Sequence, residues 1–225
     1  YDEAAAGTLP HAWKAGPQTE LLRRQLEAMD DGGLVVISLP EGLIRCAPAP
    51  YERAGLIAHY LKTSKPKSKI ILLDGKDVFS KQALFTAGWA ALYPGMVEWV
   101  SFSQGGNVAR VDPNSMTVFT DFGQHKGNVV NVIPPQIAGK LGRDAGLADA
   151  SGFCPVNAET MGSLIDPAIH VIGDSATGGE FPKSGFAANN EGKIVAKTIR
   201  ADLLGERRMP VRFTNHCWSE IAPDD

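Results

Sequence analysis

Three cysteines, Cys46, Cys154 and Cys217, are the residues of this sequence best suited to redox chemistry. No two of them lie close enough for a CxxC zinc or redox motif, and three are too few for a disulfide scaffold. One disulfide with one remaining thiol is compatible with the sequence in three alternative pairings. Three reduced, buried thiols are equally compatible with it, so the spacing alone leaves the pairing open.

Cys46 lies between a predicted strand and a predicted helix, a position that favours an ionised thiol. The helix dipole and the neighbouring Arg45 or Arg53 would stabilise the thiolate. A dinucleotide-binding unit has its glycine-rich phosphate loop, GxGxxG, at this point, and that loop is absent here. Binding of NAD is therefore disfavoured, and we interpret Asp74, at the end of the next strand, as a turn residue.

A second candidate site follows a hydrophobic strand predicted at residues 169–172, which ends in Gly173 and Asp174. Ligands bind α/β sheets at the carboxyl edge of the strands. Gly173 would let a cofactor approach the backbone, and Asp174 would accept a hydrogen bond from a sugar-alcohol hydroxyl. An ordinary strand-end turn is the alternative interpretation.

Lys183, Ser184 and Gly185 open a long helix predicted at residues 184–203. Ser184 can cap this helix, so that its unpaired N–H groups and positive dipole end face the region beyond the strand edge. A flavin ring gathers negative charge when it is reduced and is a natural occupant. The alternative is an ordinary capped helix packed on a sheet.

His216 lies next to Cys217, where an imidazole can transfer protons to or from a thiol. A merely solvated loop histidine is the alternative. The other histidines show no metal-ligand spacing, so no metal site is predicted.

The chain is predicted to alternate strands and helices, to continue as a run of short antiparallel strands, and then to alternate again. Continuous apolar runs at 34–39 and 69–74 predict strands buried on both faces, and a helix between them completes a βαβ unit. The remaining predicted elements are helices at 19–29, 51–61 and 79–92 and strands at 96–101, 107–111, 116–120 and 128–133.

The composition is that of a globular protein. The chain has 225 residues and a net charge of −3, so a nucleic-acid partner is not indicated. The longest apolar runs are far too short to span a bilayer. Neither a starting Met nor a signal peptide is present, so we expect Tyr1 to be the edge of a processed or truncated product.

Seven collinear stretches carry a family resemblance: residues 10–16, 45–53, 58–62, 131–135, 152–156, 170–174 and 182–185. Together they resemble the flavoprotein subunit of flavocytochrome c sulfide dehydrogenase, a family related to the sulfide:quinone oxidoreductases. The match covers nearly the whole chain. The resemblance implies an α/β, Rossmann-like flavoprotein with two dinucleotide-binding domains, the FAD/NAD(P)-binding fold, present here incompletely.

The resemblance also implies a domain division. The divisions are 1–17, a remnant of the FAD domain or a linker; 18–127, a nicotinamide-domain-like insert with a βαβ unit and a β-meander; 128–205, the returning half of the FAD domain; and 206–225, the start of a C-terminal domain. We expect the family's N-terminal GxGxxG turn and its C-terminal end to be missing. Strands from residue 128 onward would then expose a sheet edge and an apolar face, which predicts association with another chain.

The function implied by the resemblance is FAD-dependent oxidation of sulfide in an oxidising periplasm. Cys46 and Cys217 would form a redox-active disulfide, Cys154 would be the odd thiol, and Glu52 would be a candidate base. Sulfide would attack the disulfide, and electrons would pass through the flavin to the haem of a cytochrome c subunit. The predicted FAD-binding residues are Gly173, Asp174, Lys183, Ser184 and Gly185.

Two other functions stay open at this point. One is a quinone- or NAD(P)H-linked disulfide oxidoreductase of the same superfamily, whose nicotinamide form the missing GxGxxG disfavours. The other is a non-catalytic truncated paralogue that keeps a docking surface for a cytochrome but holds no cofactor. Flavin absorption by the purified protein would separate the enzyme from this docking module.

Overall fold

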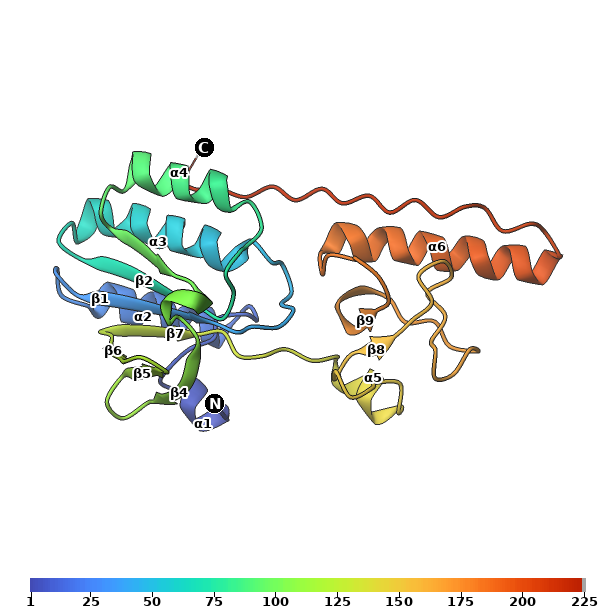
Figure 1. The fold of residues 1–225 in the computed structure, drawn as a ribbon, viewed down its shortest axis with the longest axis horizontal. Helices are drawn as coiled ribbons and strands as arrows, with labels where there is room; N and C mark the ends of the chain where they lie inside the picture. The colour runs from blue at the N-terminus through green and yellow to red at the C-terminus, as the bar shows by residue number, and fades with distance from the viewer. Residues whose placement is uncertain (224–225) are drawn as a thin grey trace. The chain divides into compact units, whose positions relative to one another are not determined.

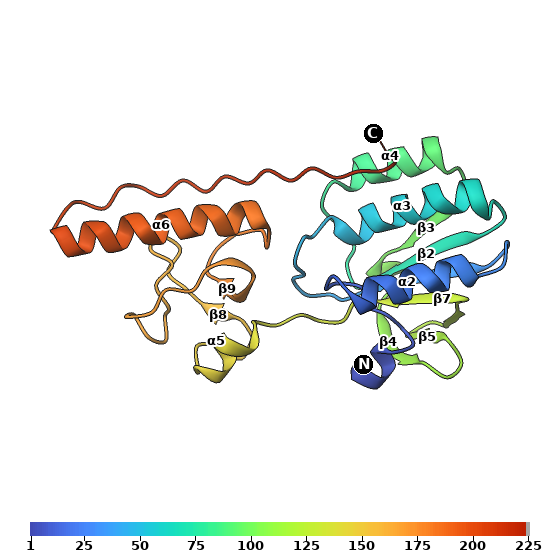
Figure 2. The same cartoon turned by 180° about the vertical axis from the view of Figure 1, so that it is seen from behind.

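The computed structural model describes residues 1–223, which form two compact units (Figures 1 and 2). The first unit comprises Tyr1–Leu43, Pro48–Pro135 and the segment that begins at Ser219. The second comprises Ile44–Ala47 and Gln136–Trp218. The loop that carries Cys46 therefore belongs to the second unit, although the elements on either side of it belong to the first.

The first unit is built on a four-stranded, all-parallel sheet in the order β3-β2-β1-β7. Its strands are β1 (Leu34–Leu39), β2 (Lys69–Asp74), β3 (Val97–Val100) and β7 (Val129–Val132). The bounds of β1 and β2 confirm the predictions from their apolar runs. Every residue of these two strands after the first is buried, as a parallel sheet with both faces covered requires.

β3 is parallel to β2, so the antiparallel pairing predicted for residues 96–101 is wrong. Helix α4 (Gln82–Leu92) connects the two strands, and a crossover of this kind makes the next strand parallel. α4 begins at Gln82 rather than at Phe79, since the ring of Phe79 stacks on Tyr51 and Lys81 takes a left-handed conformation at the N-cap.

Helices α2 (Pro17–Ala28) and α3 (Ala49–Ser64) pack on the sheet, α2 against β7 and α3 against the other three strands. A short helix, α1 (Glu3–Ala6), precedes them. α2 begins at Pro17, with Gly16 as its N-cap, rather than at Thr19. Proline suits the first helical position because the N–H that it lacks would have no intrahelical partner there.

A small antiparallel sheet follows β3 and the short 3₁₀ helix η1 (Phe102–Gln104). Its strands are β4 (Val108–Asp112), β5 (Thr117–Thr120) and β6 (Gln124–Lys126). The first two agree with the strands predicted at 107–111 and 116–120. β6 was not predicted, since its three residues are polar and carry no apolar alternation.

β7 belongs to the first unit, where it pairs in parallel with β1. Val129 and Val130 are fully buried, and the Nδ2 of Asn131 donates hydrogen bonds to the carbonyl oxygens of Pro10 and His11. The apolar face expected to be exposed from residue 128 onward is therefore covered at this strand. The unit continues through Pro135, past the division expected at residue 127.

The second unit contains few regular elements. They are α5 (Lys140–Asp144), β8 (Cys154–Pro155), the 3₁₀ helix η2 (Gly173–Ser175), β9 (Ala176–Thr177) and α6 (Gly185–Leu204). The strand predicted at 169–172 is wrong: within the described chain this stretch forms only a bridge between His170 and Gly162. Among residues 1–223 it has no neighbouring strand to complete a ladder, and Ile169 and Ile172 are 38% and 43% exposed.

The long helix of the second unit confirms the sequence prediction. α6 runs from Gly185 to Leu204, and Ser184 is its N-cap. Within residues 1–223, α6 and the other helices all lack the length or the apolar content that crossing a membrane would need.

Candidate functional site

The start of α6 is held by its capping residue. The Oγ of Ser184 accepts a hydrogen bond from the N–H of Ala187 at 3.1 Å and donates one to Oδ1 of Asn215 at 2.7 Å. The first N–H groups of a helix have no intrahelical acceptor and carry the positive end of its dipole. A Cβ placed on Gly185 would meet no atom within 4 Å, so the backbone is open to a ligand here.

Lys183 is buried directly before this helix. Its Nζ donates to the carbonyl oxygens of Asp174 at 2.8 Å and Ala176 at 3.0 Å, and it lies 4.0 Å from the centre of the Phe153 ring. Burial lowers the pKa of its amine. Lys183 therefore fixes the backbone that carries Asp174.

Gly173 and Asp174 lie in η2 rather than at the end of a strand. Gly173 has a φ of 71°, a left-handed conformation that favours glycine. Its N–H donates to Oε2 of Glu191 at 2.5 Å. Glu191, on α6, is only 2% exposed, so a buried carboxylate positions this turn.

Sequence reasoning missed Glu191, although a signal was present. The buried residues of α6 recur along one helical face at Ala187, Glu191, Thr198 and Ala201. An acid on the inward stripe of an amphipathic helix needs a buried partner, and here that partner is the Gly173 amide.

Replacing Glu191 by Gln is expected to raise the free energy of unfolding near neutral pH. Burial raises the pKa of Glu191 more than the Gly173 amide and Lys183 lower it. Protonated Glu191 therefore stabilises the folded state. This stabilisation is fully present below the pKa of the unfolded state, about 4.3, and is lost as the pH rises through the pKa of the folded state. Glu191→Gln removes this titration but keeps an acceptor for Gly173.

Urea unfolding between pH 4 and pH 8 measures this effect. The free energy of unfolding of Glu191→Gln should exceed that of the wild type by an amount that grows as the pH rises. Glu159→Gln, at an exposed acid of the same unit, is the matched control and should leave the pH slope unchanged. Identical slopes for the wild type and Glu191→Gln would contradict the interpretation.

Both segments that carry the candidate redox cysteines bind near the start of α6. The N–H of Cys46 donates to the carbonyl oxygen of Lys183 at 2.8 Å. Two residues before Cys217, Asn215 accepts the hydrogen bond from Ser184. The structure therefore brings the Cys46 loop and the Cys217 segment to two adjacent residues, Lys183 and Ser184.

Further contacts hold the Cys217 segment against α6. The Nδ2 of Asn190 donates to the carbonyl oxygen of Thr214 at 2.8 Å, and the ring centres of His216 and Phe186 are 5.8 Å apart. Cys154, in contrast, is fully buried in β8, where burial raises the pKa of its thiol. Its surroundings are those of an inert structural cysteine.

Glu52 and Arg53 lie in the first turn of α3. The Oε1 of Glu52 accepts a hydrogen bond from the N–H of Glu220 at 3.0 Å. The Arg53 guanidinium donates to the carbonyl oxygens of His11 and Ala12, and burial lowers its pKa to about 10. These contacts hold the Arg53 guanidinium inside the first unit.

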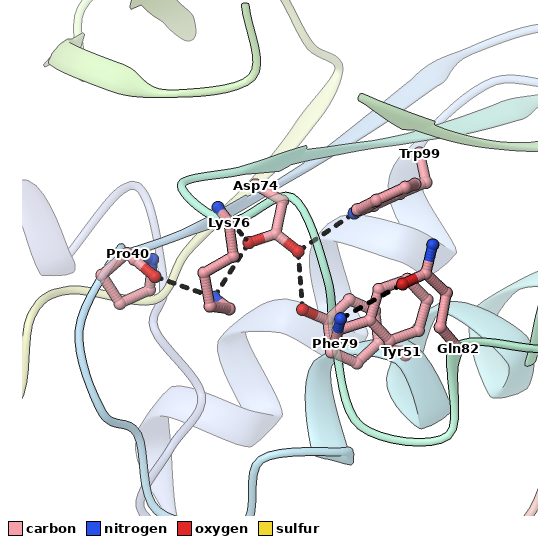
Figure 3. A network of polar contacts seen from close by, with 7 residues as sticks. All are labelled: Pro40, Tyr51, Asp74, Lys76, Phe79, Gln82 and Trp99. Carbon is pink, nitrogen blue, oxygen red and sulfur yellow. Dashed lines mark hydrogen bonds and ion pairs between the residues drawn. The ribbon is translucent and has the colours of Figure 1, made fainter. Parts of the chain in front are cut away.

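Asp74 is the centre of a buried polar network rather than a simple turn residue (Figure 3). Its Oδ2 accepts hydrogen bonds from the Tyr51 hydroxyl at 2.6 Å and from Nε1 of Trp99 at 3.0 Å. Its Oδ1 forms an ion pair with Nζ of Lys76 at 2.8 Å. Burial and the Asp74 carboxylate raise the pKa of Tyr51, so its hydroxyl stays protonated as a donor.

This network occupies the carboxyl end of β2, where a dinucleotide-binding unit holds its ligand. At the start of α3, Pro50 has no N–H, and the amides of Tyr51 and Glu52 already donate to the Pro48 carbonyl. The ring of Phe79 stacks on Tyr51 with centres 3.7 Å apart. These contacts occupy the Tyr51 and Glu52 amides, which a pyrophosphate at the start of α3 would need as donors.

Comparison with solved structures defines the class of fold as that of the FAD/NAD(P)-binding oxidoreductases. The chain superposes on the NAD-dependent persulfide reductase of A. fulgidus (TM-score 0.57, 18% identity, 91% of this chain and 36% of that one). It also superposes on a ferredoxin reductase of Rhodopseudomonas palustris (0.54, 17%, 91% and 50%). A chain in the mitochondrial ATP synthase of Tetrahymena thermophila gives a TM-score of 0.58 at 15% identity, covering 89% and 50%.

The family is given by a sequence model that matches residues 19–134, just over half of the chain. That model describes the central region of the flavoprotein chain of sulfide dehydrogenase (flavocytochrome c). The chain belongs to this family. It spans half or less of the length of the solved structures named above.

Proposed function

We propose that this chain is part of an FAD-dependent enzyme that oxidises sulfide through a Cys46–Cys217 disulfide and passes electrons to a cytochrome c subunit in the periplasm. The observation that carries the proposal is the attachment of both cysteine segments to the residues that open α6. Membership of the sulfide dehydrogenase flavoprotein family supports the substrate and the haem partner.

The residues at the start of α6 fit the ring end of a flavin. The open backbone at Gly185 and the positive end of the helix dipole suit a group that gathers negative charge. Glu191 and Lys183 hold the turn that carries Asp174. The Asp174 carboxylate would accept a hydrogen bond from a ribityl hydroxyl. An FAD held by these residues would supply two-electron uptake and one-electron release to a haem.

The cysteines supply the first chemical step. Hydrosulfide attacks the sulfur of Cys217, a new S–S bond forms as a persulfide on that residue, and Cys46 leaves as a thiolate. The sulfide sulfur is oxidised and the protein disulfide is reduced. Cys46 is the better leaving group because its loop is hydrogen-bonded beside the positive end of α6, and Glu52 would take the proton of hydrogen sulfide.

The nicotinamide-linked alternative is disfavoured by the first unit. The βαβ connection has Pro48 and Pro50 at the helix start where phosphate-binding amides are needed. The non-catalytic docking module differs from the enzyme in one measurable respect, because it would bind no flavin.

Titration of the purified protein with FAD, followed by anaerobic addition of sulfide, tests the proposal. We expect flavin absorption to appear on the protein and to bleach when sulfide is added, and the cytochrome haem to be reduced when it is present. A protein that stays colourless with FAD would favour the docking module. Bound flavin that bleaches with NADH but not with sulfide would favour the nicotinamide-linked enzyme.

A further inference from the structure

The segment that follows Cys217 is bound to helices α3 and α4 of the first unit. The Tyr93 hydroxyl donates to the carbonyl oxygen of Ile221 at 2.8 Å, and Nζ of Lys81 donates to Oγ of Ser219 at 3.0 Å. The N–H of Glu220 donates to Glu52. Three consecutive residues, 219–221, are thus each fixed by a separate hydrogen bond.

Two glycines make room for this segment. A Cβ on Gly55 of α3 would lie 3.0 Å from the carbonyl oxygen and 3.4 Å from the Cα of Ile221. A Cβ on Gly88 of α4 would overlap with Cδ1 of Ile221. Glycine in a helix interior costs about 1 kcal/mol of stability relative to alanine. A glycine on each of these two helices, both next to Ile221, therefore indicates that the helix surfaces are shaped to fit this residue.

The bound segment is joined covalently to one candidate redox cysteine and lies near the chain of the other. Ile221 follows Cys217 by four residues, and α3 begins three residues after Cys46. The Glu52 carboxylate, in the first turn of α3, holds Glu220. The first turn of α3 therefore limits how far the chains leading to both cysteines can move.

We propose that residues 219–221, which we name the tail anchor, position Cys217 for disulfide formation with Cys46, and that Ile221 is its central positioning residue. This inference rests on the proposed function, because it requires the Cys46–Cys217 pair. On the other side of Cys217, Asn215 and Thr214 are held by Ser184 and Asn190. Cys217 lies in a stretch of chain that is fixed at both ends.

The physical effect of such an anchor is on effective concentration. The stretch 206–218 has no regular secondary structure, so without the hydrogen bonds at residues 219–221 Cys217 would sample more positions away from Cys46. Tethering raises the local concentration of one thiol at the other without any new contact at the sulfurs. The disulfide then becomes more stable relative to the dithiol, and its midpoint potential becomes more negative.

Gly55→Ala tests the anchor with little risk to the fold, because alanine raises the helix propensity of α3 while its Cβ pushes the Ile221 backbone away. Ile221→Ala removes the side chain that lies against Gly55 and Gly88. Gly192→Ala is the matched control: it makes the same change inside α6, where the new Cβ would meet its nearest atom at 3.7 Å. The midpoint potential of the cysteine pair is measured by thiol labelling in glutathione or dithiothreitol buffers, with peptide mapping to identify the pair.

We expect Gly55→Ala and Ile221→Ala each to lower the equilibrium constant for Cys46–Cys217 disulfide formation about tenfold, a shift of about 30 mV to a more positive potential. Gly192→Ala should leave it unchanged. If the wild type forms the disulfide and neither variant moves its potential, the tail anchor is overturned while the proposed function stands. If peptide mapping finds no Cys46–Cys217 bond in the oxidised wild type, the proposed function fails, and the anchor's role fails with it.

Discussion

Replacing Cys46 by Ser is expected to lower the rate of sulfide-dependent flavin reduction by at least about a thousandfold, since the nucleophilic steps of covalent catalysis do not proceed without the reacting group. The serine hydroxyl cannot form a disulfide with Cys217, so hydrosulfide has no sulfur–sulfur bond to attack. The hydrogen bond that holds this loop uses the N–H of residue 46 and the carbonyl oxygen of Lys183. Flavin binding should therefore survive the substitution.

Stopped-flow absorption of the FAD-loaded protein under anaerobic conditions measures this rate. Cys154→Ser is the matched control, because Cys154 is buried in β8 and its thiol pKa is raised by burial. It should change the rate of flavin reduction by no more than a few fold. A Cys46→Ser protein that reduces its flavin at the wild-type rate would show that sulfide reaches the flavin without the disulfide.

The parts of the fold that could be predicted from the sequence are those set by local pattern. The largely apolar runs of β1 and β2 gave their bounds correctly, because burial on both faces favours a continuous apolar run over alternation. Ser184 was identified as the cap of α6 because a capping side chain bonds only to its own first turn.

The errors arose where partners distant in the chain decide the structure. Residues 169–172 have a strand composition but lack a neighbouring strand among the described residues, so they stay irregular. The direction of β3 depends on the path of α4, which an alternating pattern does not encode. The start of α4 was misplaced because Phe79 belongs to an aromatic stack with Tyr51.

The candidate site shows the same division. The sequence marked Cys46, Cys217 and Ser184 by residue type and position. Glu191 and the tail anchor went unnoticed, because each is defined by a contact across many residues: Glu191 to Gly173 across 18, and Glu220 to Glu52 across 168. The place of Glu191 on the buried face of α6 is a local signal, but the partner of each contact is not encoded locally in a single sequence.

Asp74→Ala is expected to destabilise the first unit by about 3–5 kcal/mol, the cost of removing one partner from a buried ion pair. The Asp74 carboxylate is fully buried and accepts hydrogen bonds from Tyr51 and Trp99 as well as the Lys76 ion pair. Its removal leaves a buried hydroxyl and an indole N–H without their acceptor. An unsatisfied buried polar group costs about 1–3 kcal/mol.

Tyr51→Phe separates the hydrogen bond from the packing, because phenylalanine keeps the ring that stacks on Phe79. We expect a loss of about 1–3 kcal/mol, smaller than that of Asp74→Ala, since Trp99 and Lys76 still satisfy the carboxylate. Urea unfolding followed by tryptophan fluorescence measures the loss of stability in both variants. Asp121→Ala, at an exposed acid of the same unit, is the control, and its free energy of unfolding should stay within about 0.5 kcal/mol of the wild type. If Asp74→Ala lowers the free energy of unfolding no more than Asp121→Ala does, the buried network does not stabilise the first unit. The carboxyl end of β2 would then again be a candidate site for a nucleotide.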